Sequence, residues 1–135
     1  MGQRMKSPAY SKQTPMKGKS VSAHPYSPAY QAGGFGFVSG ALSVDENYIP
    51  VSGRAEAIEA AATRLAERLA TIGMSMQDIV KTTYFVTDLT LREEANSHYE
   101  QFFSAPRPAR TFVEVSALPY GATVEIEAIA HRGQE

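Results

Sequence analysis

Three charged side chains near the end of the chain lie in stretches that otherwise alternate like β-strands. Arg110 precedes the run TFVEV, and Glu125 and Glu127 interrupt the run VEIEAIA. On this pattern alone, an arginine here is more often a charge at a sheet edge, and the glutamates are more often the polar side of a strand. An arginine fork can also donate two parallel hydrogen bonds to a carboxylate, and a glutamate can act as a general base. The pattern therefore leaves two interpretations open, surface charges or an anion receptor beside a catalytic acid.

Other residue types offer little further chemistry. His24, His98 and His131 are far apart and lack the spacing of metal ligands, so we expect no metal site. The chain has no cysteine, which excludes disulfides, zinc–thiolate sites and cysteine nucleophiles. The run GGFG lacks the lysine and the helix of a phosphate-binding loop, and no GxSxG motif occurs.

Length and composition indicate one globular domain. The chain has 135 residues, of which 43% are hydrophobic and 20% charged. No run of about 18 apolar residues occurs, and residues 1–20 lack the apolar centre of a secretory signal. A cytoplasmic protein is therefore the default expectation.

The charge is distributed unevenly along the chain. No acidic residue precedes Asp45, whereas residues from 21 onward hold 8 basic and 14 acidic side chains. An acidic body lacks the basic surface expected of a nucleic-acid-binding protein. Residues 1–20 are basic and rich in Ser, Pro and Gly, so we interpret them as a flexible tail, with a transit peptide or an expression leader as alternatives.

The clearest periodic stretch is residues 53–73, which we predict to be a helix. Its apolar side chains recur at spacings of three and four, Ser52 is the expected N-cap and Gly73 the expected stop. The apolar set is Ile58, Ala62, Leu65, Leu69 and Ile72. We assign Arg64 and Arg68 to the solvated side.

The remaining pattern predicts an α+β fold. Strands are expected from Phe35 to about Gly40 and over 79–86, 109–116 and 122–130, with a second helix over 91–103. Two helices suffice to cover one face of such a sheet. Phe112 and Ile129 are assigned to the other face, where apolar side chains favour oligomerisation through the sheet.

Five segments of the chain resemble the RidA/YjgF family of enamine/imine deaminases. They follow the family order from about His24 to Arg132, which divides the chain into the tail 1–20 and a RidA-like domain 21–135. The segments are PYSPAYQAGGFGFVSG, DIVKTTYFVTDL, NSHYEQFF, RPARTFVEVSALP and VEIEAIA.

This resemblance implies a fold, an assembly and a reaction. Family members have a chorismate-mutase-like two-layer domain with a mixed sheet, and they form homotrimers whose sheets line a central barrel. Their active sites lie between neighbouring subunits. They hydrolyse 2-imino acids or enamine tautomers (2-aminoacrylate/2-iminopropanoate and 2-iminobutanoate) to 2-keto acids and ammonia, without metal or organic cofactor. The implied partners are a small imino or keto acid and further copies of the chain, with no nucleic acid or membrane.

The resemblance also assigns roles to residues of this sequence. Arg110 matches the family arginine that binds the substrate carboxylate, and Glu125 matches the glutamate that positions the attacking water. Glu127 is a weaker candidate for that acid. Substrate-binding positions match Tyr26, Ser39, Gly40, Asn96 and Phe112.

Three departures from the family pattern bear on specificity. Ala41 replaces a common glutamine, Phe112 replaces a common cysteine, and the loop before Pro108 is short. These departures leave carboxylate binding intact, and two alternatives stay open: a deaminase of another imino acid of the aminomuconate type, and a non-catalytic module that binds small carboxylates. Ribonuclease activity, attributed to some members, is disfavoured by the acidic body.

Overall fold

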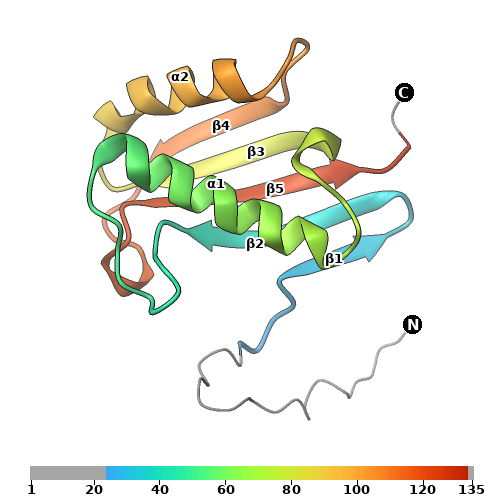
Figure 1. Ribbon diagram of the computed structural model, residues 1–135, viewed down its shortest axis with the longest axis horizontal. Helices are drawn as coiled ribbons and strands as arrows, with labels where there is room; N and C mark the ends of the chain where they lie inside the picture. Colours follow the sequence, from blue (N-terminus) through green and yellow to red (C-terminus); the bar gives the residue numbers. More distant parts are fainter. Residues whose placement is uncertain (1–23, 134–135) are drawn as a thin grey trace.

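The computed structural model describes residues 24–133 as a two-layer α+β domain, with two helices on one face of a five-stranded sheet (Figure 1). The main elements in chain order are β1 (Ala29–Ala32), β2 (Phe35–Leu42), α1 (Arg54–Ala70), β3 (Ile79–Val86), α2 (Arg92–Phe102), β4 (Ala109–Glu114) and β5 (Val124–His131). This arrangement confirms the predicted fold class and the second helix. The predicted tail, residues 1–20, lies outside the described residues. Within residues 24–133, no helix combines the length and apolarity needed to cross a lipid bilayer.

The sheet is mixed, with strand order β1-β2-β5-β3-β4. Only β3 and β4 run parallel, and the other neighbouring strands are antiparallel. A parallel pair needs a crossover connection, which α2 supplies between β3 and β4. The topology therefore places β4, which begins at Ala109 and Arg110, at one edge of the sheet and the β1–β2 hairpin at the other.

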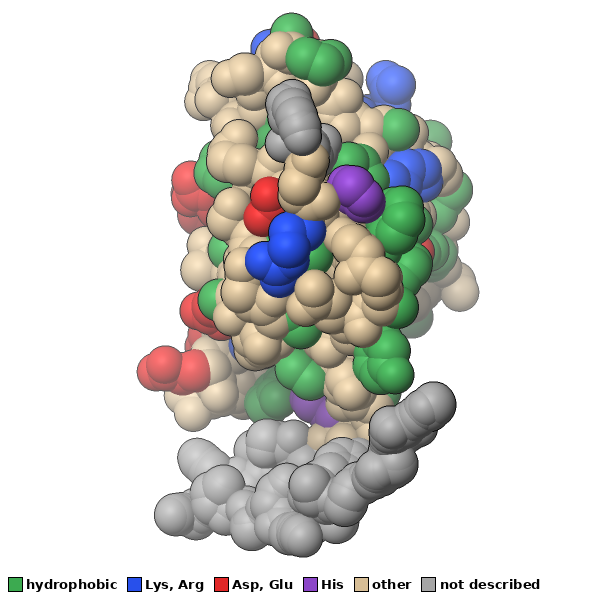
Figure 2. Space-filling view, turned by 90° about the vertical axis from the view of Figure 1, so that its right-hand side faces the viewer, with side chains coloured by type: hydrophobic (Ala, Val, Ile, Leu, Met, Phe, Trp, Pro, Cys, Tyr) green, Lys and Arg blue, Asp and Glu red, His purple; other side chains and the backbone are tan. Residues whose placement is uncertain are grey.

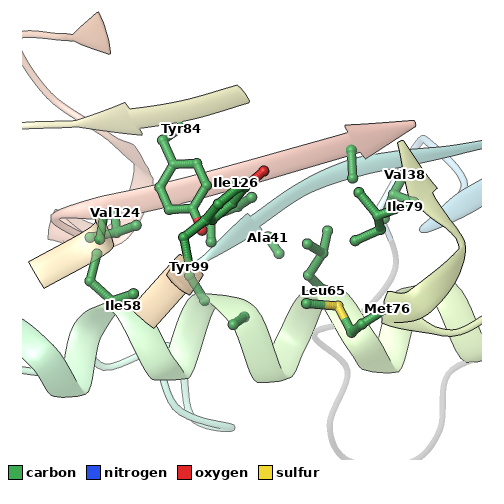
Figure 3. Packing of buried hydrophobic residues seen from close by; sticks show 14 of the residues in the cluster. Val38, Ala41, Ile58, Leu65, Met76, Ile79, Tyr84, Tyr99, Val124 and Ile126 are labelled. Atoms are coloured by element: carbon green, nitrogen blue, oxygen red, sulfur yellow. The ribbon is translucent and has the colours of Figure 1, made fainter. Parts of the chain in front are cut away.

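Helix α1 buries its apolar stripe against the sheet. Ile58, Leu65 and Leu69 are each at most 1% exposed, and Figure 3 shows Ile58 and Leu65 pointing from α1 toward the strands. Complete burial of such a side chain contributes about 1.5–3 kcal/mol, so this stripe anchors the helix layer. Gly73, with φ 73°, ends the segment as predicted. The predicted cap at Ser52 is wrong: the N-cap is Gly53, whose carbonyl accepts from Ala57 and which offers no side-chain cap.

The sheet face away from the helices carries exposed apolar side chains. Phe35, Phe37 and Val113 are 44%, 45% and 36% exposed, and Ile129 is half-buried among them. In Figure 2, hydrophobic side chains gather on one side of the molecule and acidic ones on the opposite side. The assignment of Ile129 to this open face is confirmed, but the assignment of Phe112 is wrong. Phe112 packs against the core beside Tyr84, because alternation along β4 turns Arg110 and Phe112 toward the helices.

Candidate functional site

Arg110 lies on the helix-covered side of the sheet, near the start of edge strand β4. Its register partner in β3 is Thr82, which is 1% exposed and faces the core. One Nη2 hydrogen donates to Oδ1 of Asn96 on helix α2. The structure therefore brings together two of the predicted site residues, Arg110 and Asn96, from β4 and α2.

Three aromatic rings surround this guanidinium. Its carbon lies 5.3 Å from the ring centre of Tyr84, 4.8 Å from that of Tyr99 and 5.0 Å from that of Phe112. Contacts of a cation with ring faces are favourable and become stronger as water is excluded. The rings of Tyr84 and Phe112 also stack on each other at 5.5 Å, which fixes the walls of the site. Phe112, predicted to alter the cleft, is one of these walls.

The guanidinium of Arg110 has no counter-ion among residues 24–133. Its Nη1 is buried and has no hydrogen-bond partner, and no carboxylate in the described part of the chain forms an ion pair with it. Burial lowers the pKa of Arg110, and the charge of Arg92 lowers it further. A buried charge is costly unless it is paired. We call Arg110, Asn96, Tyr84, Tyr99 and Phe112 the Arg110 half-site, an arrangement suited to receive an anion.

A second group of predicted residues meets near the β1–β2 edge of the sheet. Strand β1 pairs only with residues 35–38 of β2, so the next residues of β2 lie at an edge that β1 does not cover. A pocket of about 210 Å³ lies here, and we call it the Glu125 pocket. It is lined by His24, Tyr26, Gly40, Leu42, Val44, Tyr48, Arg64, Arg68, Pro119, Tyr120 and Glu125.

Glu125 is half-buried in this pocket. Burial raises the pKa of its carboxyl, the nearby Glu127 raises it further, and the positive charge of Arg68 opposes both. A carboxylate with a raised pKa is a stronger base. Gly40 makes room for it, because a Cβ at that position would overlap the carboxylate of Glu125.

Tyr26 lines the pocket, whereas Ser39 does not line it and holds the segment that precedes β1. Tyr26 is 48% exposed and stacks on His24 with ring centres 4.9 Å apart. The hydroxyl of Ser39 donates to the carbonyl of Ser27 at 2.7 Å, and the amide of Ser39 donates to Pro28. Ser39 therefore fixes the segment that carries Tyr26. Ala41, a departure from the family pattern, is fully buried in the core and does not line the pocket.

The two groups do not meet within one chain. Register aligns Arg110 with Thr82 on the helix-covered face, whereas Glu125 is aligned with Phe85 on the open face. Adjacent residues of a strand point to opposite faces, so Arg110 and Glu125 lie on opposite sides of the sheet. One copy of the chain thus presents two separate parts of the predicted site.

Several residues that complete these two parts were missed by the sequence analysis. Arg64 and Arg68 turn into the Glu125 pocket and do not extend into solvent. Their four-residue spacing, which places them on one helix face, was the available signal. Tyr84 and Tyr99 were recognised only as strand and helix positions. Nothing in the local sequence marks Tyr120 as a neighbour of Glu125.

Comparison with known proteins identifies the family. The family model described as endoribonuclease L-PSP matches residues 17–132. The chain belongs to the RidA/YjgF family. The bovine 2-iminobutanoate/2-iminopropanoate deaminase is 36% identical, with 81% of each chain covered. The RutC family protein y4sK of Sinorhizobium fredii is 43% identical over 78% of this chain and 85% of that protein.

A solved structure supports the same assignment. RidA from an Antarctic Psychrobacter species superposes with a TM-score of 0.74 at 31% identity, covering 89% of this chain and 99% of that chain. The fold, with two helices on a mixed five-stranded sheet, is therefore shared with RidA/YjgF proteins. Family relatives named as imine deaminases support a deaminase-type enzyme, although the family model itself is described by ribonuclease activity.

Proposed function

We propose that this protein hydrolyses 2-imino acids and their enamine tautomers to 2-keto acids and ammonia, in sites formed between copies of the chain. In this proposal the Arg110 half-site of one copy binds the substrate carboxylate. The Glu125 pocket of a neighbouring copy supplies the carboxylate that positions water. A homotrimer joined through the open sheet face, as the family resemblance implies, would bring the two together.

The chemistry needs only modest assistance. A protonated imine carbon is electrophilic, and the water oxygen attacks it while Glu125 accepts a water proton. Glu125 passes this proton to the nitrogen of the carbinolamine, the carbon–nitrogen bond breaks, and ammonia leaves while the hydroxyl gives its proton to Glu125 and becomes the carbonyl. General-base catalysis of this kind accelerates a reaction by about 10²- to 10⁴-fold. Holding the substrate carboxylate in a fixed orientation accelerates it further.

The observation that carries the proposal is the unpaired guanidinium of Arg110. Asn96 and three rings hold it in place before any ligand arrives, with a buried Nη1 directed at no protein acceptor. A planar carboxylate can accept from such a fork through two oxygens. A mere edge charge would instead point into solvent, where neither aromatic walls nor burial would be needed.

Ammonia release tests the proposal directly. Imines generated in place from alanine or 2-aminobutyrate by an amino-acid oxidase should lose ammonia faster with the protein than in buffer alone. In Arg110→Ala the kcat/KM should fall about 10³-fold, because two charge-assisted hydrogen bonds are lost. Arg110→Lys retains the charge without the fork and should be intermediate. Equal rates for the protein, Arg110→Ala and buffer would reject the proposal.

A non-catalytic carboxylate-binding module is the second candidate, because the Arg110 half-site is assembled within one copy while Glu125 lies elsewhere. It predicts that 2-ketobutyrate binds without any imine turnover, and that Arg110→Ala abolishes that binding. Calorimetry and the ammonia assay, performed on one preparation, separate the two candidates.

We propose a cytoplasmic location for this protein. A relative from Arabidopsis thaliana carries the name "Reactive Intermediate Deaminase A, chloroplastic". The basic residues 1–20 are the segment whose deletion would test for a transit function.

A further inference from the structure

Two arginines from helix α1 enter the Glu125 pocket. Arg64 and Arg68 are one helical turn apart and share a face, and both are half-buried where they line the pocket. Leu65 and Leu69 anchor the adjacent face in the core, so the direction of the two arginines is fixed by packing. They are therefore built into the pocket wall.

Among the described residues, no carboxylate forms an ion pair with either guanidinium group. The Nε atoms of Arg64 and Arg68 are buried without a hydrogen-bond partner. Arg64 donates Nη2 only to the carbonyls of Val44 and Asp45, at 3.4 and 3.2 Å. Arg68 makes no side-chain hydrogen bond or ion pair within residues 24–133, and burial lowers its pKa.

Glu125 lines the same pocket as the two arginines, but it forms no ion pair with either of them. Glu125 interacts with Arg68 by charge alone, beyond the distance of an ion pair, and its own carboxyl has a raised pKa. Residues 1–23 contain no Asp or Glu, so their side chains provide no carboxylate for the pocket. Burial and the charges of Arg68 and Arg64 lower the pKa of His24, so the pocket disfavours its protonation.

Aromatic rings form the rest of the wall. The rings of Tyr48 and Tyr120 lie 4.8 Å apart, and the guanidinium of Arg64 lies 5.6 Å from the ring centre of Tyr48. The hydroxyl of Tyr48 is 3.3 Å from Nε2 of His24. The pocket thus has two cations, rings and one weakly held carboxylate, a composition that favours a bound anion over a bound cation.

We propose that Arg64 and Arg68 form a second anion subsite that binds a distal carboxylate of the substrate, so that the preferred imino acids are dicarboxylic. This inference rests on the proposed function. Arg110 of one copy would hold the carboxylate next to the imine, and the two arginines of the neighbouring copy would hold the other end. Glu125 lies in the same pocket as these arginines, where the imine carbon must be placed for attack by water.

The test compares imines that differ only in the distal group. Imines of alanine, aspartate and glutamate, generated by oxidases of matching specificity, present one monocarboxylate and two dicarboxylates of different length. Wild-type protein should show a higher kcat/KM for at least one of the dicarboxylates. Arg68→Gln and Arg64→Gln should lower the ratio of dicarboxylate to monocarboxylate kcat/KM by about 10- to 100-fold, because each removes charge-assisted hydrogen bonds.

Two further variants control for charge and folding. Arg54→Gln removes an arginine from the same helix, but its partners are Glu94 and Asp88 outside the pocket, and its ratio should equal that of the wild type. Arg68→Lys keeps the charge and loses the fork, and its ratio should be intermediate. Thermal unfolding and sedimentation show whether each variant retains the fold and the assembly.

The outcomes separate this subsite from the proposed function. Turnover of all imines without a dicarboxylate preference, or equal losses on both classes in Arg68→Gln, would overturn the subsite and leave the deaminase standing. If no imine is turned over, calorimetry with 2-ketoglutarate and oxaloacetate against pyruvate decides. Tighter binding of the dicarboxylates that depends on Arg68 supports the subsite without the reaction, and equal binding rejects it.

Discussion

The Arg110 half-site and the Glu125 pocket differ in how much of their surroundings one copy of the chain supplies. Arg110 is enclosed by rings from β3, β4 and α2, and Asn96 already occupies one of its nitrogens. The Glu125 pocket is walled by Tyr26 and Tyr120, which remain 48% and 53% exposed. The surroundings of Arg110 are thus supplied within one copy, whereas the walls of the Glu125 pocket are largely exposed.

Backbone conformation separates the two regions further. Tyr48 and Tyr120 both have φ 63°, in the left-handed region that bulky residues rarely adopt. Both line the Glu125 pocket, and their rings contact each other. Such conformations persist only where the surroundings hold them, and they concentrate at functional sites. In the proposed reaction, the carboxylate would therefore bind at a preorganised site, and water would attack beside a locally strained rim.

The largest expected effect comes from mixing two inactive variants. If each site combines Arg110 of one copy with Glu125 of the next, neither Arg110→Ala nor Glu125→Gln alone retains a complete site. After subunit exchange in equal amounts, a random trimer has complete sites at about one quarter of positions. Activity in the ammonia assay should therefore rise from near background to about a quarter of the wild-type value.

A doubly substituted protein provides the matched control for mixing. After exchange with an equal amount of wild type, Arg110→Ala/Glu125→Gln should also leave about a quarter of the sites complete, so activity should fall below the half expected from dilution alone. If the two single variants fail to complement after exchange has been verified by mass spectrometry, the half-sites do not combine across copies.

Replacing Glu125 should have the next largest effect, because it should lower activity and raise the stability of the fold. Glu125→Gln should lower kcat about 10²-fold or more, through loss of the base. The raised pKa means that the Glu125 carboxyl binds its proton more tightly in the folded protein than in the unfolded chain. Ionised Glu125 therefore destabilises the fold. This destabilisation is absent below the ordinary pKa of 4.5 and grows as pH rises through the folded pKa. At neutral pH the variant should gain at most about 1 kcal/mol, because the carboxylate is partly solvated.

Glu127→Gln is the matched control, two residues along the same strand and face. It should leave kcat within a few-fold of wild type. Urea unfolding from pH 4 to 8 measures the stability difference. An equal loss of activity in both variants would contradict the specific role of Glu125.

Gly40→Ala should disturb Glu125 without touching Arg110. A Cβ at Gly40 would overlap the carboxylate and displace it, and we expect a loss of about tenfold in kcat with unchanged binding of a keto acid. In the Glu125→Gln background, Gly40→Ala should lower kcat little further, because the base that it would displace is already absent. Additive losses in this cycle would show that Gly40 acts through the fold rather than through Glu125.

The layer structure was predictable because its signals are local. The helix period over residues 53–73 and the β-branched run from Ile79 to Val86 each specify one element, and both were placed within a few residues. The cap was missed because Ser52 is followed by Gly53, whose positive φ begins the helix without a side-chain bond. The face of Phe112 was misassigned because alternation gives two equivalent faces until the pairing register is known.

The site was less accessible to sequence reasoning, for a different reason. The family resemblance identified Arg110, Asn96 and Glu125, but whether they meet depends on strand register and on a neighbouring copy. Arg64 and Arg68 have the spacing of an ordinary solvated helix face. Strand β1 begins only at Ala29, opposite Val38, and leaves the next part of β2 uncovered, so that face of the helix becomes a pocket wall.

The smallest expected effect tests whether the Arg110 half-site is held from within one copy. The buried hydroxyl of Thr82 bonds the hydroxyl of Tyr99 at 2.7 Å, and the other acceptor near Tyr99 is the carbonyl of Pro108 at 3.4 Å. Thr82→Val keeps the shape and removes this bond, so the free energy of unfolding should fall by about 1–2 kcal/mol. Thr83→Val, its neighbour on the open face, should change it by less than about 0.5 kcal/mol. Because the ring of Tyr99 lies against Arg110, keto-acid affinity should weaken in Thr82→Val alone, by a few-fold in calorimetry. Equal unfolding shifts in the two variants would mean that the rings around Arg110 are fixed by something other than this bond, such as contacts with a second copy of the chain.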